Sequence, residues 1–221
     1  MSVTFPGETA AYRSARDELL KAEMDLMRHT EKVATLRRAL PLGGKVASDY
    51  VFDEAGNDVK LSALFGDKST LVLYSFMFGP KAEAPCPMCT SFLDALNGNA
   101  DAIAQNVALS VTAKSPFARI QAFARGRHWD HLRLISSASS TYQIDYHGED
   151  KSSNQWPMMN VFTKKDAAIY HFWGSEMLYA KGEEGMDSRH IDTLWPLWNI
   201  LDLTPQGRGA EWYPSNVYAK R

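Results

Sequence analysis

The 221-residue sequence contains only two cysteines, which stand three positions apart at Cys86 and Cys89. A secreted domain held together by disulfides normally carries several cysteines spread along the chain, so this class is disfavoured. A lone close pair in a reducing compartment is more typical of catalysis, redox sensing or metal binding. The shortage of cysteine therefore directs attention to this one segment.

The sequence also lacks long apolar runs and a strong net charge. No stretch approaches the ~18 consecutive apolar residues that span a bilayer, and the N-terminal MSVTFPGETAAYRSARDELL contains no apolar run of signal-peptide type. The formal net charge is only -2, which gives no reason to expect nucleic acid or a membrane as a partner. We therefore expect a cytoplasmic protein that binds neither.

The N-terminal segment predicts one long helix from Ala10 to Leu40, ended by Pro41 and the following glycines. Such a helix either packs on the rest of its own chain or contacts a second copy in a homodimer, and both alternatives stay open. We expect residues 1–44 to form an N-terminal extension and residues 45–221 to form a single domain. The apolar residues that recur at helical spacing are Leu19, Leu20, Met24, Met27, Val33, Leu36 and Leu40.

Between residues 45 and 136 the sequence alternates segments typical of strands and helices. The segment LVLYSFMF is almost wholly apolar, which favours a central strand covered on both faces. Right-handed strand–helix–strand crossovers make the strands of this region parallel. The expected elements are a hairpin turning at Gly56-Asn57, a helical turn near Phe65, strands at Leu71–Phe78, Val107–Ala113 and Leu132–Ser136, a helix after Cys86, and a helix that begins at Pro116 with Ser115 as its N-cap.

The C-terminal part begins with a polar, irregular segment from Ser137 to Gln155. A hairpin of Met158–Phe162 and Ala168–Phe172 is expected next, then a closing helix over Ser188–Asn199 and an irregular tail. This element order is that of the α/β thioredoxin-like fold, with three layers around a central mixed sheet. The sequence adds an N-terminal helical and hairpin extension to it.

Cys86 and Cys89 stand where the apolar strand gives way to a helix, and this placement predicts their chemistry. Pro87 suits the first helical position, which makes Cys86 the N-cap and places Cys89 one turn further on. Free N–H groups and the helix dipole stabilise a thiolate at such a position. We therefore expect Cys86 to attack a substrate disulfide and Cys89 to resolve the mixed disulfide. Pro87 and Met88 form the loop that would meet the partner.

Trp156 and Pro157 directly precede the predicted hairpin. Thioredoxin folds place a cis-proline at this point, facing the cysteine loop, where its neighbouring backbone pairs with substrate. We therefore expect a cis bond before Pro157 and a substrate-binding role for both residues. The alternative is an ordinary trans proline that begins an edge strand.

Other functions are compatible with the same cysteine pair. The protein could be a redox-sensing binding module without turnover, or a zinc-binding module, although zinc needs two further ligands from dispersed histidines. Peroxide reduction is a lesser alternative, because Glu83 stands where peroxiredoxins carry Thr or Ser, three positions before the reactive cysteine. Our expectation is a protein or low-molecular-weight thiol or disulfide as partner, with no cofactor and no metal.

Long segments of the chain resemble an uncharacterised bacterial family of thioredoxin-like proteins, described as predicted dithiol–disulfide oxidoreductases. The resemblance runs from about Ala10 to Tyr213 and includes LRRALP, DYVFDEAG, LYSFMFGP, CPMCTSFLD, AKSPFARIQAFA and LDLTPQGRG. It implies a thioredoxin-like fold with Cys86 and Cys89 as the redox pair, and it implies no known substrate. Many relatives have His at the position of Ser75 and a Gly–Cys–Pro–Gly–Cys loop in place of PCPMC. Thioredoxin itself carries Trp before its first cysteine and Gly–Pro between the two, where this chain has Pro85 and Pro87-Met88, so the redox potential of thioredoxin does not carry over.

Overall fold

The computed structural model describes residues 3–181, 184, 192–209 and 212–218. Its chain divides into two compact units, Met1–Pro41 and Leu42–Arg221. The first unit contains one long helix, α1 (Ala10–Arg38), whose N-cap Thr9 accepts a hydrogen bond from the backbone N–H of Tyr12. None of the helix residues is buried. The helix expected from the apolar spacing is confirmed, and it ends two residues earlier than Leu40.

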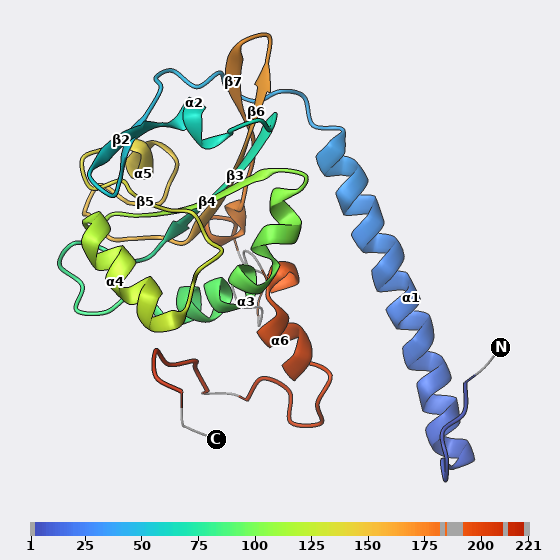
Figure 1. Cartoon of the computed structure of the whole chain (residues 1–221). Coiled ribbons are helices and arrows are strands. Elements are labelled where there is room, and N and C mark those ends of the chain that lie inside the picture. The colour runs from blue at the N-terminus through green and yellow to red at the C-terminus, as the bar shows by residue number, and fades with distance from the viewer. Residues whose placement is uncertain (1–2, 182–183, 185–191, 210–211, 219–221) are drawn as a thin grey trace. The chain divides into compact units, whose positions relative to one another are not determined.

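The second unit is built on a seven-stranded mixed sheet in the order β2-β1-β5-β4-β3-β6-β7 (Figure 1). The parallel strands β3, β4 and β5 lie next to one another, and all other pairs are antiparallel. A β-α-β unit with an antiparallel hairpin beside its first strand is the thioredoxin-like arrangement predicted from the element order. The strands are β1 (Val51–Glu54), β2 (Asn57–Lys60), β3 (Thr70–Phe76), β4 (Ala108–Ala113), β5 (Leu134–Ser136), β6 (Met158–Lys165) and β7 (Ala168–Gly174).

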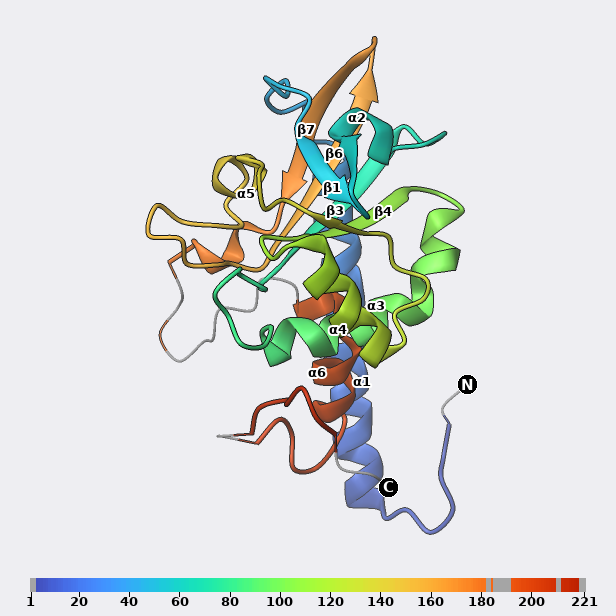
Figure 2. The same ribbon diagram turned by 60° about the vertical axis from the view of Figure 1, so that its left-hand side comes forward.

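Helices cover both faces of this sheet, as Figure 1 and the rotated view in Figure 2 show. The longer helices α3, α4 and α6 lie on one face, and the short helices α2 and α5 lie on the other. No helix in the part of the chain that the structure describes is long and apolar enough to cross a membrane. The helices are α2 (Leu61–Leu64), α3 (Pro87–Ala104), α4 (Phe117–Arg127), α5 (Tyr142–Asp145) and α6 (Pro196–Leu201), with 3-10 turns at Glu176–Leu178 and Asp192–Leu194.

The central strand β3 divides the interior into two cores because its side chains alternate between the faces of the sheet. Tyr74 and Phe76 point into the core under α3 and α4, together with Cys89. Leu71 and Leu73 point into the opposite core, under α2 and α5. This double burial explains why the strand is apolar along its whole length.

Three expectations about local structure need correction or completion. Helix α4 begins at Phe117 with Pro116 at its N-cap, so Ser115 does not cap it. The Ser115 hydroxyl donates instead to the carbonyl of Gly79, at 2.9 Å, and this tertiary bond outweighs the local cap. The segment expected to be irregular contains α5, and the closing helix begins at Pro196. Residues 188–191 of the expected closing helix lie outside the described residues.

Candidate active site

Strand β3 leads through a ten-residue connection, residues 77–86, into the start of α3. Cys86 is the N-cap of this helix and Pro87 is its first residue, as the sequence predicts. The backbone N–H of Cys86 donates to the carbonyl of Met77 at 3.0 Å, which ties the cysteine back to the end of the strand. The backbone N–H and the hydroxyl of Thr90 both donate to the Cys86 carbonyl at 3.0 Å. The first turn of α3 therefore holds Cys86 in place.

The two thiols are free and have different environments. Cys86 is half-buried, whereas the side chain of Cys89 is 2% exposed. A hydrogen bond from the Cys89 thiol lowers the pKa of Cys86 to about 6, and the N–H groups of Cys89 and Met88 act in the same direction against the effect of burial. Burial raises the pKa of Cys89 well above its usual range, and the hydrogen bond and charge of Cys86 raise it further. At neutral pH the pair therefore consists of an accessible thiolate and a buried thiol.

Tyr74 is a third member of this site that the sequence reasoning missed. It lies on β3, is 1% exposed, and its ring packs 5.0 Å from the ring of Phe92 on α3. Its hydroxyl hydrogen-bonds to the Cys89 sulfur, which lowers the pKa of Cys89. Burial raises the pKa of Tyr74 well above its usual range, so the hydroxyl stays protonated and acts as a donor. The sequence signal was a phenol inside a mostly apolar strand, since a buried Tyr hydroxyl needs a partner.

Helix α4 supports the loop that precedes the cysteines. The guanidinium of Arg119 donates to the carbonyls of Pro80 at 2.7 Å and Ala82 at 2.6 Å. The same group lies 4.8 Å from the centre of the Phe78 ring. Because two loop carbonyls and one loop ring share a single guanidinium, the approach to Cys86 is fixed from outside the cysteine segment.

Comparison with known protein families matches nearly the whole chain. The family described as "Bacterial protein of unknown function (DUF899)" covers residues 2–221. The chain belongs to this family. No curated protein matches its sequence.

Several solved structures of low sequence identity resemble this chain in backbone fold. Thioredoxin peroxidase I of Plasmodium yoelii is 16% identical over 81% of this chain and 100% of its own, with a TM-score of 0.45. Peroxidoxin BcpB of Mycobacterium tuberculosis is 20% identical over 71% of this chain and 95% of its own, with a TM-score of 0.46. The 2-Cys peroxiredoxin of Plasmodium vivax is 14% identical over 73% of this chain and 96% of its own, with a TM-score of 0.46.

The C-terminal tail of this DUF899 chain returns to the cysteine loop. The side-chain amide of Asn216 donates to the carbonyl of Pro85, the residue before Cys86, at 2.8 Å. Arg127 at the end of α4 donates to the Asn216 carbonyl at 3.1 Å. This contact could not be predicted from sequence patterns, because Asn216 and Pro85 are separated by 131 positions.

Asp94 on α3 anchors the tail at a second point. Its carboxylate accepts hydrogen bonds from the Arg127 guanidinium, from the indole N–H of Trp129 at 2.8 Å and from the hydroxyl of Tyr218 at 2.8 Å. The Arg127 guanidinium also lies 4.5 Å from the centre of the Tyr218 ring. One carboxylate thus joins α3, the end of α4 and the tail.

We expect Asp94→Ala to lower the free energy of unfolding by about 1–3 kcal/mol, because it leaves a guanidinium and a buried indole N–H without their acceptor. Limited proteolysis should then cut the tail faster than in the parent protein. Asp101→Ala is the matched control on the same helix. Among the described residues Asp101 pairs with His131 alone, at an exposed position, so this change should alter stability by less than about 0.5 kcal/mol. Equal losses in both variants would contradict the anchoring role.

The other residues predicted for the site are Pro157, Trp156 and Met88. None of the described peptide bonds is cis, so the expected cis bond before Pro157 is wrong. A trans bond is favoured by ~0.5–1 kcal/mol before any proline, and the surrounding contacts do not reverse that preference here. Trp156 is exposed, and its backbone N–H donates to the Gly148 carbonyl at 2.9 Å. Met88 is half-buried and packs against the core beside the cysteines.

The zinc alternative can be assessed on the described residues. Among them, no group of three or more His, Cys, Asp or Glu side chains could hold a metal ion, so the two cysteines have no further zinc ligands beside them there. Trp195 and Trp198 are buried in the core under α3, with the Trp195 ring 5.8 Å from Phe92. These two tryptophans therefore belong to the core.

Proposed function

We propose that this DUF899 protein is a thiol–disulfide oxidoreductase in which Cys86 is the nucleophile and Cys89 the resolving residue. The observation that supports this proposal best is that the two adjacent thiols differ in their protonation at neutral pH. The thiolate, rather than the thiol, is the form that attacks disulfides, and Cys86 holds that form at neutral pH. The protonated Cys89 lies one helical turn further along α3.

The reaction proceeds by two successive exchanges. The Cys86 thiolate attacks one sulfur of a substrate disulfide, forms a mixed disulfide with it and releases the other substrate sulfur as a thiolate. Cys89 then loses its proton to water or to the released thiolate, and its sulfur attacks Cys86. The second substrate thiolate leaves, and a Cys86–Cys89 disulfide remains. Two electrons have passed to the substrate, and an external dithiol or thiol must return them.

The first exchange also activates the second. Before the reaction, burial raises the pKa of Cys89, and the hydrogen bond and negative charge of Cys86 add to this effect. Once Cys86 is bonded to substrate, its negative charge is gone, so the penalty for ionising Cys89 falls. The hydroxyl of Tyr74 remains as a donor to the new thiolate. Cys89 thus becomes a nucleophile only after there is something to resolve.

Turnover separates this proposal from its alternatives. An oxidoreductase reduces insulin disulfides repeatedly when dithiothreitol is supplied, at a rate proportional to protein concentration. A redox-sensing module reacts once and changes its binding or oligomeric state without further turnover. Stopped-flow mixing with hydrogen peroxide tests the peroxidase alternative, and a faster reaction with peroxide than with the disulfide would favour it over our proposal.

We expect the rate of Cys86 alkylation by iodoacetamide to follow a titration with its midpoint near pH 6. A lowered pKa means that the thiolate fraction rises through that pH and is nearly complete at pH 7, whereas an unperturbed thiol titrates at about 8.5. Mass spectrometry of the alkylated peptide identifies the residue. Cys89→Ala removes the hydrogen bond that lowers the pKa most, so its midpoint should move towards 8.5. An unchanged midpoint in that variant would show that Cys89 does not activate Cys86.

A further inference from the structure

A cavity lies on the face of the sheet opposite the cysteines. Met159 on β6 packs in the core that contains Cys89, and its neighbours Met158 and Asn160 therefore point to the opposite face. There they line a pocket of about 650 Å³, within the ~300–1,000 Å³ typical of small-molecule sites. Its remaining lining comes from the end of α5, from β7, from the turn after β7 and from Gly44-Lys45.

The hydrogen bonds of this pocket fix the orientation of Asn160 and the tautomer of His171. The Asn160 amide nitrogen donates to the backbone carbonyl of Tyr146 at 3.2 Å, and a carbonyl can only accept. The Asn160 amide oxygen must therefore be the atom 2.9 Å from the His171 Nε2, so it accepts a hydrogen bond from that nitrogen. Burial lowers the pKa of His171, so the ring is neutral at pH 7 and its Nδ1 is an acceptor.

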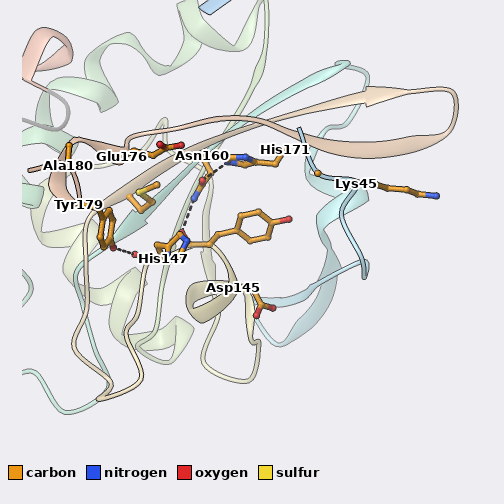
Figure 3. A pocket seen from close by; sticks show the side chains of 11 residues that line it. Lys45, Asp145, His147, Asn160, His171, Glu176, Tyr179 and Ala180 are labelled. Atoms are coloured by element: carbon orange, nitrogen blue, oxygen red, sulfur yellow. Dashed lines mark hydrogen bonds between the residues drawn. The ribbon is translucent and has the colours of Figure 1, made fainter. Parts of the chain in front are cut away.

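Few of the other polar side chains at the pocket offer a free hydrogen-bond donor. Within the described ranges, neither the Glu176 carboxylate nor the ring nitrogens of His147 have a hydrogen-bond partner. The Tyr179 hydroxyl already donates to the His147 carbonyl at 2.7 Å. Figure 3 shows the ammonium end of Lys45 turned away from the group formed by the two histidines. Unused acceptors therefore outnumber unused donors here.

Aromatic rings form much of the remaining wall. The rings of His147 and Tyr179 are 5.6 Å apart, and those of Tyr146 and His171 are 5.5 Å apart. Figure 3 shows His147, Tyr179, Asn160 and His171 grouped around one hollow, with Glu176 beside it. The faces of aromatic rings attract cations, and a nearby carboxylate strengthens the attraction.

We propose that this pocket binds a small organic cation whose ammonium group lies between the aromatic rings and the Glu176 carboxylate. A quaternary ammonium group supplies the positive charge that the ring faces and the Glu176 carboxylate attract, and a hydroxyl on the same molecule supplies a hydrogen-bond donor for the unused acceptors. An anion would face the carboxylate without a cationic partner directed at it, because Lys45 points elsewhere. The proposal does not depend on the chemistry of the cysteines, which lie on the other face of the sheet.

Choline and its neutral carbon isostere 3,3-dimethyl-1-butanol provide a direct test, with binding to the full chain measured by NMR titration. We expect saturable binding of choline with shifts of the His147 and His171 ring signals, and at least about threefold weaker binding of the isostere. Glu176→Gln, at an exposed position, should weaken choline binding by about two- to fivefold. Glu83→Gln removes the same charge from the exposed loop before Cys86 and should leave the affinity unchanged.

Three results would overturn the proposal. Equal binding of the neutral isostere would show a general apolar pocket, and competition by acetate would show an anion site. An unchanged affinity in Glu176→Gln would show that the cation binds elsewhere. Cys86→Ser should bind choline as the parent protein does, so the outcome for this pocket and the outcome for the redox proposal can be read separately.

Discussion

A Cys86→Ser variant should reduce insulin disulfides about a hundredfold more slowly than the parent protein, or not at all. Serine is close in size to cysteine, but its hydroxyl does not ionise near neutral pH, so the attacking anion is lost while the start of α3 keeps its shape. Cys86 is held through its own backbone N–H and carbonyl, and serine retains both groups. The measurement is the initial rate of insulin reduction at a fixed concentration of dithiothreitol.

Cys89→Ser is the matched variant and should fail at a different step. When dithiothreitol is left out, its Cys86 still attacks and one equivalent of substrate thiol is released. The mixed disulfide then accumulates because nothing resolves it. Intact-protein mass spectrometry should find this adduct in Cys89→Ser and not in Cys86→Ser. Thermal unfolding of both variants checks that they remain folded. Full activity in Cys86→Ser, or an adduct on Cys89, would refute the assigned roles.

Those features of the site that depend on neighbouring residues could be predicted from the sequence. Pro87 begins a helix because its fixed φ suits the first position, and this alone made Cys86 the N-cap. The apolar strand, the parallel crossovers and the hairpin of β6 and β7 follow from periodicity and handedness. Local pattern and chain chirality were sufficient for these elements.

Features that depend on packing between distant segments could not be predicted in the same way. Asp94 gives no signal in sequence, since its partners on α4 and the tail stand up to 124 positions away. The prediction of a cis bond before Pro157 was wrong for a related reason. Its position before β6 suggested a cis bond, but isomer preference is decided by tertiary contacts that a sequence does not display. The pocket lined by Asn160 and His171 draws its side chains from several separate segments and was likewise not predicted.

Tyr74→Phe should slow the second exchange about tenfold or more while sparing the first. The variant keeps the ring that packs against Phe92 and removes only the hydroxyl that donates to Cys89. A hydrogen bond to a charged group contributes about 1.5–3 kcal/mol, and here it stabilises the Cys89 thiolate that must form before attack. Rapid quenching should therefore show the mixed disulfide with Cys86 building up as in Cys89→Ser, and then decaying slowly.

The pH dependence of that decay distinguishes a chemical role from a structural one. The Tyr74 hydroxyl lowers the pKa of Cys89, so its removal raises that pKa, and the decay of the adduct should reach half its maximal rate at a higher pH than in the parent protein. Tyr142→Phe removes an equally buried hydroxyl on the other face of the sheet, where it accepts from Asn160. That variant should keep the parental profile even if its stability falls. A slow decay with an unshifted profile in Tyr74→Phe would mean that the phenol only supports the packing around Cys89, because packing changes the rate of attack without changing the pH at which its nucleophile ionises.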